Sequence, residues 1–522
     1  MKPVLSSWHA LMAACVAALS TASHADVAVT AVNAQAPRTG ATPLSFVVER
    51  SGDTSAAVSF RYKTVDGSAR AGRDYVAAEG TATIPAGQTR TTVAVTVQPR
   101  TSGGTKALQM SLQLASPSVD GANPSGHVYA ESGSVKLERG IENAAVADFN
   151  GDGLLDVAAS GPGRVYVLGN GTPAGSSTAR FAQVASYEVG FGRVRVADIN
   201  RDGRPDMVVS VSDRNQLHVL INTTATGSFS FVPTTLTTTD WGWTADVAFA
   251  DFDGDGIVDI AASNPGSSNA PGTSRALVWR NTTPVGSTTP VLTLVAMPRA
   301  SKDSDPLPQG IAAGDLNGDG KPDLVIDNQG VSVLLNTTAP GGPVSFAEPV
   351  WFPGFTMANQ IGLADTNRDG RLDIVTSNSN GWVGSTWSVL RNATTKGATT
   401  PKFKRTEFLS GAPFGLDLAD MDQDGFTDVL LSNLAADASN GGAIEVHRNL
   451  GVTDGAPSFQ TVAKLTLGDE PHTVAAGDFN RDGWPDLIGI DNVGSNLVFR
   501  FQQPAALSPR LTTPQVIGTI TP

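Results

Sequence analysis

The 522-residue sequence contains one cysteine and six histidines, and only 16% of its residues are charged and 6% aromatic. The cysteine, Cys15, lies near the N-terminus, so the chain after it cannot form an internal disulfide. The formal net charge of −13 argues against nucleic-acid binding, which requires a basic surface. After residue 25, no apolar run is long enough to span a bilayer. An exported protein of this size without disulfides needs another kind of cross-link.

The first 25 residues resemble an export signal. Lys2 precedes an apolar run, and Ser23 and Ala25 are small residues at the two positions that a signal peptidase reads. We therefore expect residues 1–25 to be cleaved and the protein to be secreted, periplasmic or on the cell surface. A membrane anchor is one alternative. Lipidation of Cys15 is another, because the preceding Met-Ala-Ala weakly resembles a lipoprotein cleavage box.

What the chain does have is a repeated acidic motif. A nine-residue pattern of Asp, any, Asp or Asn, any, Asp, Gly, any, any, Asp occurs seven times. Its starts are 50 to 64 residues apart, a period typical of propellers and other repeat arrays. The seven copies begin at Asp148, Asp198, Asp251, Asp315, Asp365, Asp420 and Asp478, and together they hold 23 of the 49 acidic residues.

The motif is suited to a hard divalent cation. Positions 1, 3, 5 and 9 offer side-chain oxygens, position 7 offers a backbone carbonyl, and Gly at position 6 permits a sharp turn. Ca²⁺ accepts such a ligand set more readily than Mg²⁺, which demands tighter octahedral geometry. An EF-hand would need Glu at position 12 and helical flanks, whereas here position 12 is never a ligand and an apolar strand begins at position 10.

The alternative to metal sites is a set of plain turns, which Asp, Asn and Gly favour on their own. Seven copies in register favour the metal, and we expect about seven Ca²⁺ that cross-link loops whose carboxylates otherwise repel one another. The expected ligands are Asp148, Asn150, Asp152, Leu154, Asp156, Asp198, Asn200, Asp202, Arg204, Asp206, Asp251, Asp253, Asp255, Ile257, Asp259, Asp315, Asn317, Asp319, Lys321, Asp323, Asp365, Asn367, Asp369, Arg371, Asp373, Asp420, Asp422, Asp424, Phe426, Asp428, Asp478, Asn480, Asp482, Trp484 and Asp486.

Between the motifs, each unit contains four short apolar segments that read as strands. Four strands in each of seven repeats predict a seven-bladed β-propeller. Residues 134–139 precede the first motif in the place where fourth strands stand elsewhere, so we expect them to complete the seventh blade. The alternative is that residues 510–518, RLTTPQVIG, supply that strand.

Over about residues 130–502 these repeats resemble FG-GAP/VCBS repeats, the calcium-loop propeller repeats also seen in integrin α subunits. The literal Phe-Gly-Gly-Ala-Pro letters are absent, so the VCBS-like variant is the more similar. The resemblance implies that loop positions 1, 3, 5 and 9 bind Ca²⁺.

The segment before the propeller contains none of these loops. Residues 57–64 and 108–114 alternate apolar and polar side chains, which is typical of a β-sandwich with one wet face. Residues 64–97 resemble a Calx-beta domain, but residues 98–107, where calcium-binding members carry an acidic run, hold no acid. We therefore expect the fold without its Ca²⁺ site. The expected fold class is all-β: a signal peptide at 1–25, an Ig-like sandwich at 26–122, a linker at 123–133, the propeller at 134–502 and a tail at 503–522.

Three Asn-Thr-Thr sequences, at Asn222, Asn281 and Asn336, match glycosylation acceptors. Their fixed place after the third strand of a unit favours a repeated structural turn instead.

Little in the sequence points to catalysis. After residue 25 the histidines are His127, His218, His447 and His472, and none lies in a recognisable triad or zinc spacing. We expect a non-enzymatic binding or adhesion protein whose partner is an extracellular protein or a carbohydrate. A lectin, or a lyase-like carbohydrate-active enzyme built on a propeller, is the alternative.

The expected ligand surface is the propeller face opposite the metal loops. Its connections are long, and aromatic rings beside Asn and Asp suit a sugar or a peptide. The candidate rings are Trp241, Trp243, Phe355, Trp382 and Phe414. The alternative is that these rings fill the central channel as core.

Overall fold

The computed structural model describes two parts of the chain. The larger part is residues 128–503, with gaps at 139, 213–215, 226–227, 238–243, 267–273, 301–307, 328–329, 354–357, 379–384, 435–441, 454–455 and 469. Outside it, the described residues are 26–30, 33–35, 42–51, 58–66, 71–98, 108–115 and 516–521. All regular elements in these ranges are β-strands, which confirms the predicted all-β fold class. The predicted signal peptide, residues 1–25, lies outside the described residues.

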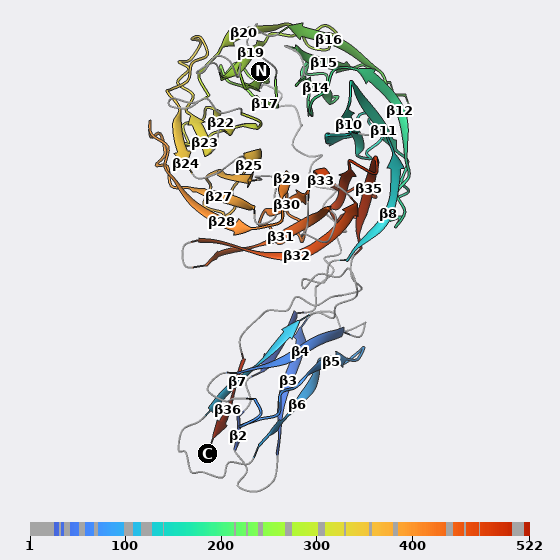
Figure 1. Ribbon diagram of the computed structural model, residues 1–522, viewed down its shortest axis with the longest axis vertical. Coiled ribbons are helices and arrows are strands. Elements are labelled where there is room, and N and C mark those ends of the chain that lie inside the picture. The colour runs from blue at the N-terminus through green and yellow to red at the C-terminus, as the bar shows by residue number, and fades with distance from the viewer. Residues whose placement is uncertain are drawn as a thin grey trace, which may run out of the picture. The chain divides into compact units, whose positions relative to one another are not determined.

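Val128–Gln503 form a seven-bladed propeller, in which every blade is a four-stranded antiparallel sheet (Figure 1). Blades 1 to 3 comprise β9 (Asn143–Ala147), β10 (Asp156–Gly161), β11 (Arg164–Asn170), β12 (Phe181–Glu188); β13 (Val194–Ala197), β14 (Asp206–Ser210), β15 (Gln216–Asn222), β16 (Phe231–Thr237); and β17 (Val247–Ala250), β18 (Asp259–Asn264), β19 (Arg275–Asn281), β20 (Leu292–Ala296). Blades 4 to 6 comprise β21 (Ile311–Gly314), β22 (Asp323–Asp327), β23 (Gly330–Leu334), β24 (Val350–Pro353); β25 (Ala358–Ala364), β26 (Asp373–Asn378), β27 (Thr386–Asn392), β28 (Phe403–Leu409); and β29 (Pro413–Ala419), β30 (Asp428–Asn433), β31 (Gly442–Thr453), β32 (Ala456–Gly468).

The seventh blade joins the two ends of the ring. Its first three strands are β33 (Pro471–Gly477), β34 (Asp486–Asp491) and β35 (Asn496–Gln503), and its fourth is β8 (Val128–Lys136), from before the first motif. β8 runs antiparallel to β35, from Val128 opposite Gln503 to Lys136 opposite Asn496. The pairing agrees with the predicted closure by the segment before the first motif, but the strand spans Val128–Lys136 instead of residues 134–139. Residues 128–133 belong to the propeller and not to a linker.

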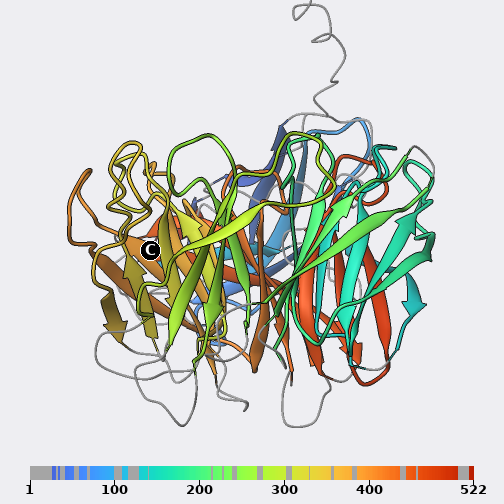
Figure 2. The same cartoon turned by 90° about the horizontal axis from the view of Figure 1, so that it is seen from above.

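The blades pack face to face, so the second strand of each blade is buried along its whole length. Apolar side chains of neighbouring blades share a core; between blades 1 and 2 it includes Phe149, Val165, Leu220 and Phe231. The outermost strands expose alternate residues, as in β20. Viewed edge-on, the strands cross the thickness of the ring and the connecting loops lie at its two faces (Figure 2). All seven acidic motifs join first to second strands, so they occupy one of these faces.

The second unit contains two sheets. One has the order β1 (Asp26–Thr30), β3 (Thr42–Ser51), β6 (Arg90–Val97), and the other has the order β2 (Asn33–Gln35), β36 (Val516–Thr521), β7 (Leu108–Ala115), β4 (Val58–Asp66), β5 (Glu79–Ile84). β36 pairs antiparallel with β7 and parallel with β2. The segment interpreted as a tail, 503–522, thus supplies a strand of the N-terminal unit. Its VIGTIT sequence is rich in β-branched residues and suits an inner strand of a sheet.

Candidate metal sites

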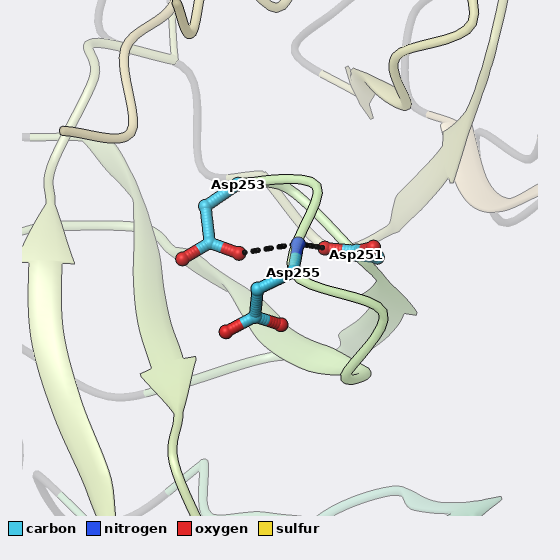
Figure 3. A group of neighbouring side chains, drawn as sticks. All are labelled: Asp251, Asp253 and Asp255. Atoms are coloured by element: carbon cyan, nitrogen blue, oxygen red, sulfur yellow. Dashed lines mark hydrogen bonds between the residues drawn. The ribbon is translucent and has the colours of Figure 1, made fainter. Parts of the chain in front are cut away.

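The first Asp of each motif organises its own loop. In blade 3, Asp251 Oδ1 accepts hydrogen bonds from the backbone N–H groups of Asp255 at 3.1 Å (Figure 3) and Gly254 at 2.8 Å, and its Oδ2 accepts one from Gly256 at 2.8 Å. Positive φ angles of 77° and 82° at Gly254 and Gly256 bend the backbone round the carboxylate, a conformation that glycine adopts without strain. The bonds from positions 5 and 6 recur in all seven loops.

Further side chains of the motif gather close to the first Asp. Carboxylate oxygens of Asp251, Asp253 and Asp255 lie within 4.8 Å of one another, and so do those of Asp420, Asp422 and Asp428. In the five loops with Asn at position 3, the Asn amide donates to the position-5 carboxylate at 2.9 to 3.2 Å. Several anionic oxygens thus converge on one small volume, and this oxygen-only donor set is the one that Ca²⁺ prefers.

Position 7 was expected to offer a backbone carbonyl. In every loop the N–H of this residue donates to Oδ1 of the position-5 Asp, which fixes the peptide beside the carboxylates. For Ile257 the distance to Asp255 Oδ1 is 2.9 Å. The side chains at positions 1, 3 and 5 therefore fit a hard cation.

The last Asp of the motif has a structural role that the sequence pattern does not reveal. Asp259 is fully buried, and it accepts hydrogen bonds from the backbone N–H groups of Phe252 at 3.0 Å and Asn281 at 2.8 Å. It therefore ties the loop to the end of the third strand. The other six blades repeat both bonds. In blade 6, Asp428 also lies among the clustered loop oxygens.

Burial makes these last carboxylates unusually easy to protonate. Desolvation raises the pKa of Asp156, Asp323 and Asp428 to about 7, of Asp206 and Asp259 to about 6 and of Asp486 to about 8, and it also raises the pKa of Asp373. The backbone hydrogen bonds oppose this effect, whereas the neighbouring loop carboxylates add to it. A bound divalent cation acts in the opposite direction, because it favours the ionised form.

The Asn residues of the Asn-Thr-Thr sequences clamp neighbouring blades together. Asn281 is fully buried, and its amide nitrogen donates to the carbonyl of Ile199 in blade 2 at 2.8 Å and to that of Val258 in its own loop at 2.9 Å. Asn222 and Asn336 make the same pair of bonds. The interpretation as a structural turn is therefore correct, and glycosylation at these buried amides is excluded in the folded propeller.

Of the five predicted aromatic residues, only Phe414 lies within the described residues. Its half-buried ring stacks on His472 with centroids 4.6 Å apart, and His472 Nδ1 lies 2.8 Å from Glu142 Oε2. The three residues come from blades 6, 7 and 1, at the ends of strands that face away from the acidic loops. Trp241, Trp243, Phe355 and Trp382 lie outside the described residues.

An arginine that the sequence analysis did not single out spans the same face. Arg193, just before β13, donates from Nη1 to Asp246 Oδ2 at 3.1 Å, to the carbonyl of Gln309 at 3.1 Å and to that of Asn359 at 3.2 Å. These partners belong to the next three blades, so one side chain links four of the seven. The sequence of a single repeat does not predict a contact of this kind.

The histidines among the described residues have structural partners. His447 Nε2 and Ser410 Oγ both contact the same oxygen of Glu445, at 3.2 and 2.8 Å, so His447 is not placed to activate Ser410. His218 Nδ1 lies 3.1 Å from Thr235 Oγ1.

No helical segment in the described part of the chain has the length and apolar content of a membrane span.

Comparisons with known proteins agree with this architecture. A model of the FG-GAP-like repeat matches residues 148–209, 198–262, 315–376 and 420–489, and a model of the Calx-beta domain matches residues 36–135. No curated protein matches the chain. Proteins with these two modules are typically adhesion or calcium-related extracellular proteins, and the modules are typically non-enzymatic.

Three solved structures are similar to parts of the chain. The apo form of the Calx CBD1 domain is 23% identical, covering 19% of this chain and 84% of its own, with a TM-score of 0.17. A chain in the structure of an active polycomb repressive complex 2 in the basal state is 9% identical, covering 72% of this chain and 98% of its own, with a TM-score of 0.45. Sqt1 of Chaetomium thermophilum, bound to the N-terminus of a ribosomal protein, is 10% identical, covering 76% and 93%, with a TM-score of 0.44. These values are too low to carry any argument about function. The chain is thus a protein of FG-GAP-like repeats, which build its seven-bladed propeller, with a Calx-beta domain in its N-terminal part.

Proposed function

We propose that the protein is an exported, non-enzymatic binding or adhesion protein whose propeller is cross-linked by about seven Ca²⁺, one in each acidic loop. The observation that carries the proposal is the convergence of carboxylates at positions 1, 3 and 5 in blade 3 and at positions 1, 3 and 9 in blade 6, on a hydrogen-bonded loop that recurs in all seven blades. Ca²⁺ supplies charge neutralisation there, and the loop residues supply the oxygens. The Calx-beta domain adds no metal site of its own, because residues 98–107 hold no acid and Asp74 is buried against Arg73 at 2.8 Å.

The ligand, an extracellular protein or a carbohydrate, binds the face opposite the loops. Two features support this placement. The acidic loops leave that face free, and it exposes part of the Phe414 and His472 pair at the junction of three blades. The sequence analysis predicts that the other candidate rings, Trp241, Trp243, Phe355 and Trp382, belong to this face.

A glycan array and an extracellular-protein array, each probed with and without Ca²⁺, test the proposal. Hits should weaken about ten- to a hundredfold in Trp241→Ala and Trp382→Ala, since an aromatic ring that contacts a ligand contributes about 1–3 kcal/mol of apolar contact. Their Ca²⁺ content should stay unchanged. Asp319→Ala, in an acidic loop, should instead lower thermal stability first. Trp variants that unfold early would show that the rings are core, and the ligand surface would have to be sought in the N-terminal unit.

A further inference from the structure

Two of the seven acidic loops differ from the rest in charge. Blades 3 and 6 carry Asp at position 3, Asp253 and Asp422, where the other five blades carry Asn. In both blades the third strand carries an arginine directly before a fully buried Asn, Asn281 or Asn449. These are Arg280 in β19 and Arg448 in β31.

Each of these arginines lies on the carboxylates of its own loop. Arg280 Nε is 2.5 Å from Asp253 Oδ2, and its Nη2 is 3.1 Å from Asp255 Oδ2. Arg448 pairs in the same way with Asp422 and, at 2.9 Å, with Asp424. One guanidinium therefore bridges positions 3 and 5, whose side chains project to the same side of the loop (Figure 3).

In the other five loops, a neutral side chain makes the hydrogen bond to position 5 that the arginine makes here. Where position 3 is Asn, its amide nitrogen donates to Oδ2 of position 5, the atom that Arg280 and Arg448 contact in blades 3 and 6. The arginine thus supplies both the missing donor and a positive charge that offsets the fourth carboxylate. Arg204 and Arg371, at position 7 of loops 2 and 5, contact Oδ2 of the position-5 carboxylate and a carbonyl of the third strand, and their partners do not include position 3.

We propose that Arg280 and Arg448 are built-in counter-ions that hold the blade-3 and blade-6 loops closed without metal and have to yield to Ca²⁺. The guanidinium and the ion need the same oxygens, and at such distances like charges repel strongly. These two loops are therefore the low-affinity class among the seven. This inference rests on the proposed Ca²⁺ binding and adds that the sites fill in two stages.

Calorimetric Ca²⁺ titration of the full chain, with melting temperatures in EDTA and in excess Ca²⁺, tests the inference. Wild type should show about five tighter sites and two weaker ones. Arg280→Met should move one weak site into the tight class, by about tenfold or more, because a unit charge about 5 Å from a divalent ion matters that much even at the dielectric of water. The melting temperature of Arg280→Met should be lower than that of wild type in EDTA, and equal to it or higher in Ca²⁺. If Arg280 had only a structural role, the variant would melt at a lower temperature than wild type in both conditions.

The chain provides a matched control and a rescue. Arg391 occupies the same strand position in blade 5, where position 3 is Asn367, so Arg391→Met should leave both site classes unchanged. The double variant Asp253→Asn with Arg280→Leu reproduces the pair found in blade 4, Asn317 and Leu335, and should join the tight class without the loss in EDTA.

Three results would overturn the inference. Seven equal sites in wild type, or weaker binding in Arg280→Met, would each contradict the counter-ion role while leaving the proposed Ca²⁺ function intact. If the wild-type protein binds no Ca²⁺, both the counter-ion role and the proposed Ca²⁺ binding are contradicted.

Discussion

At the residue scale, the motif combines two kinds of aspartate. In blade 3 the carboxylates at positions 1, 3 and 5 cluster together, whereas the last Asp is buried and holds backbone N–H groups of the loop and of the third strand. The sequence pattern predicts the first group directly, because the spacing of oxygens is visible in the letters. It does not reveal the second role, since the partner N–H groups come from residues about 7 and about 22 positions away.

Removing a loop carboxylate should lower the number of Ca²⁺ bound per chain, whereas removing an acidic residue of the N-terminal sandwich should leave that number unchanged. We expect Asp255→Ala to lose about one Ca²⁺ per chain and Asp74→Ala to lose none, because Asp74 pairs with Arg73 and lies far in sequence from any acidic loop. Elemental analysis of both proteins after dialysis decides between them. Equal losses would mean that the Calx-beta domain also holds Ca²⁺.

The blade-clamping asparagines should matter for stability and not for binding. Asn281→Ala leaves the carbonyls of Ile199 and Val258 without a buried donor, so the free energy of unfolding should fall by about 2–4 kcal/mol. Denaturant unfolding measures this. The neighbouring Thr282 is exposed, and Thr282→Ala should change stability by less than about 0.5 kcal/mol. A tolerated Asn281→Ala would show that the clamp is dispensable.

At the element scale, repetition made the propeller predictable and the arrangement of its ends only partly so. The seven copies show the order of strands within a blade. The segment before the first motif stands in the place of a fourth strand without the first three strands of its blade, and this predicts the ring closure by β8. β36 could not be predicted in the same way. VIGTIT occurs once, and its partner β7 lies some 400 residues earlier. Contacts of a single side chain between blades, such as those of Arg193, also have no repeated sequence signal.

The pairing of β36 makes a testable statement about the C-terminus. Deleting residues 504–522 removes the strand between β2 and β7 and leaves all seven blades intact. We expect the N-terminal unit to lose most of its hydrogen-exchange protection, including in β4 and β7, while the propeller keeps its melting temperature. Unchanged protection in β7 would contradict the pairing. A destabilised propeller would instead favour the alternative that residues 510–518 serve the seventh blade.

At the scale of the whole molecule, the ring is a closed array of acidic loops without disulfides to hold it. The last Asp of each motif has a pKa raised by burial, to about 6 to 8 where a value is resolved. The folded state therefore binds more protons than the unfolded chain between about pH 4 and pH 8, and stability without metal falls as pH rises through that range. Ca²⁺ needs ionised ligands, so its stabilising effect should grow over the same range.

Thermal melts at pH 5 and pH 8, each with EDTA and with Ca²⁺, check this prediction. Without metal the propeller should melt lower at pH 8 than at pH 5, and Ca²⁺ should raise the melting temperature more at pH 8. Glu445 acts in the opposite direction at acid pH. Burial alone would raise its pKa, but the hydrogen bond and charge of His447, with Ser410 and Lys464, lower it to about 2. Its contribution is therefore lost as pH falls from about 4.5 towards 2. A metal-free protein that gains stability from pH 5 to pH 8 would contradict the assigned burial.

The melting temperature of the propeller at neutral pH, measured in excess EDTA and then in 10 mM Ca²⁺, tests the central claim most directly. With dissociation constants near 10⁻⁴–10⁻³ M, each site should contribute roughly 1.4–2.7 kcal/mol at that concentration. Over seven sites this amounts to about 10 kcal/mol or more, which raises the melting temperature of a domain this size by about 10 °C or more. A melting temperature that is the same in EDTA and in Ca²⁺ would show that the seven acidic loops are plain turns and that the ring is held together without metal.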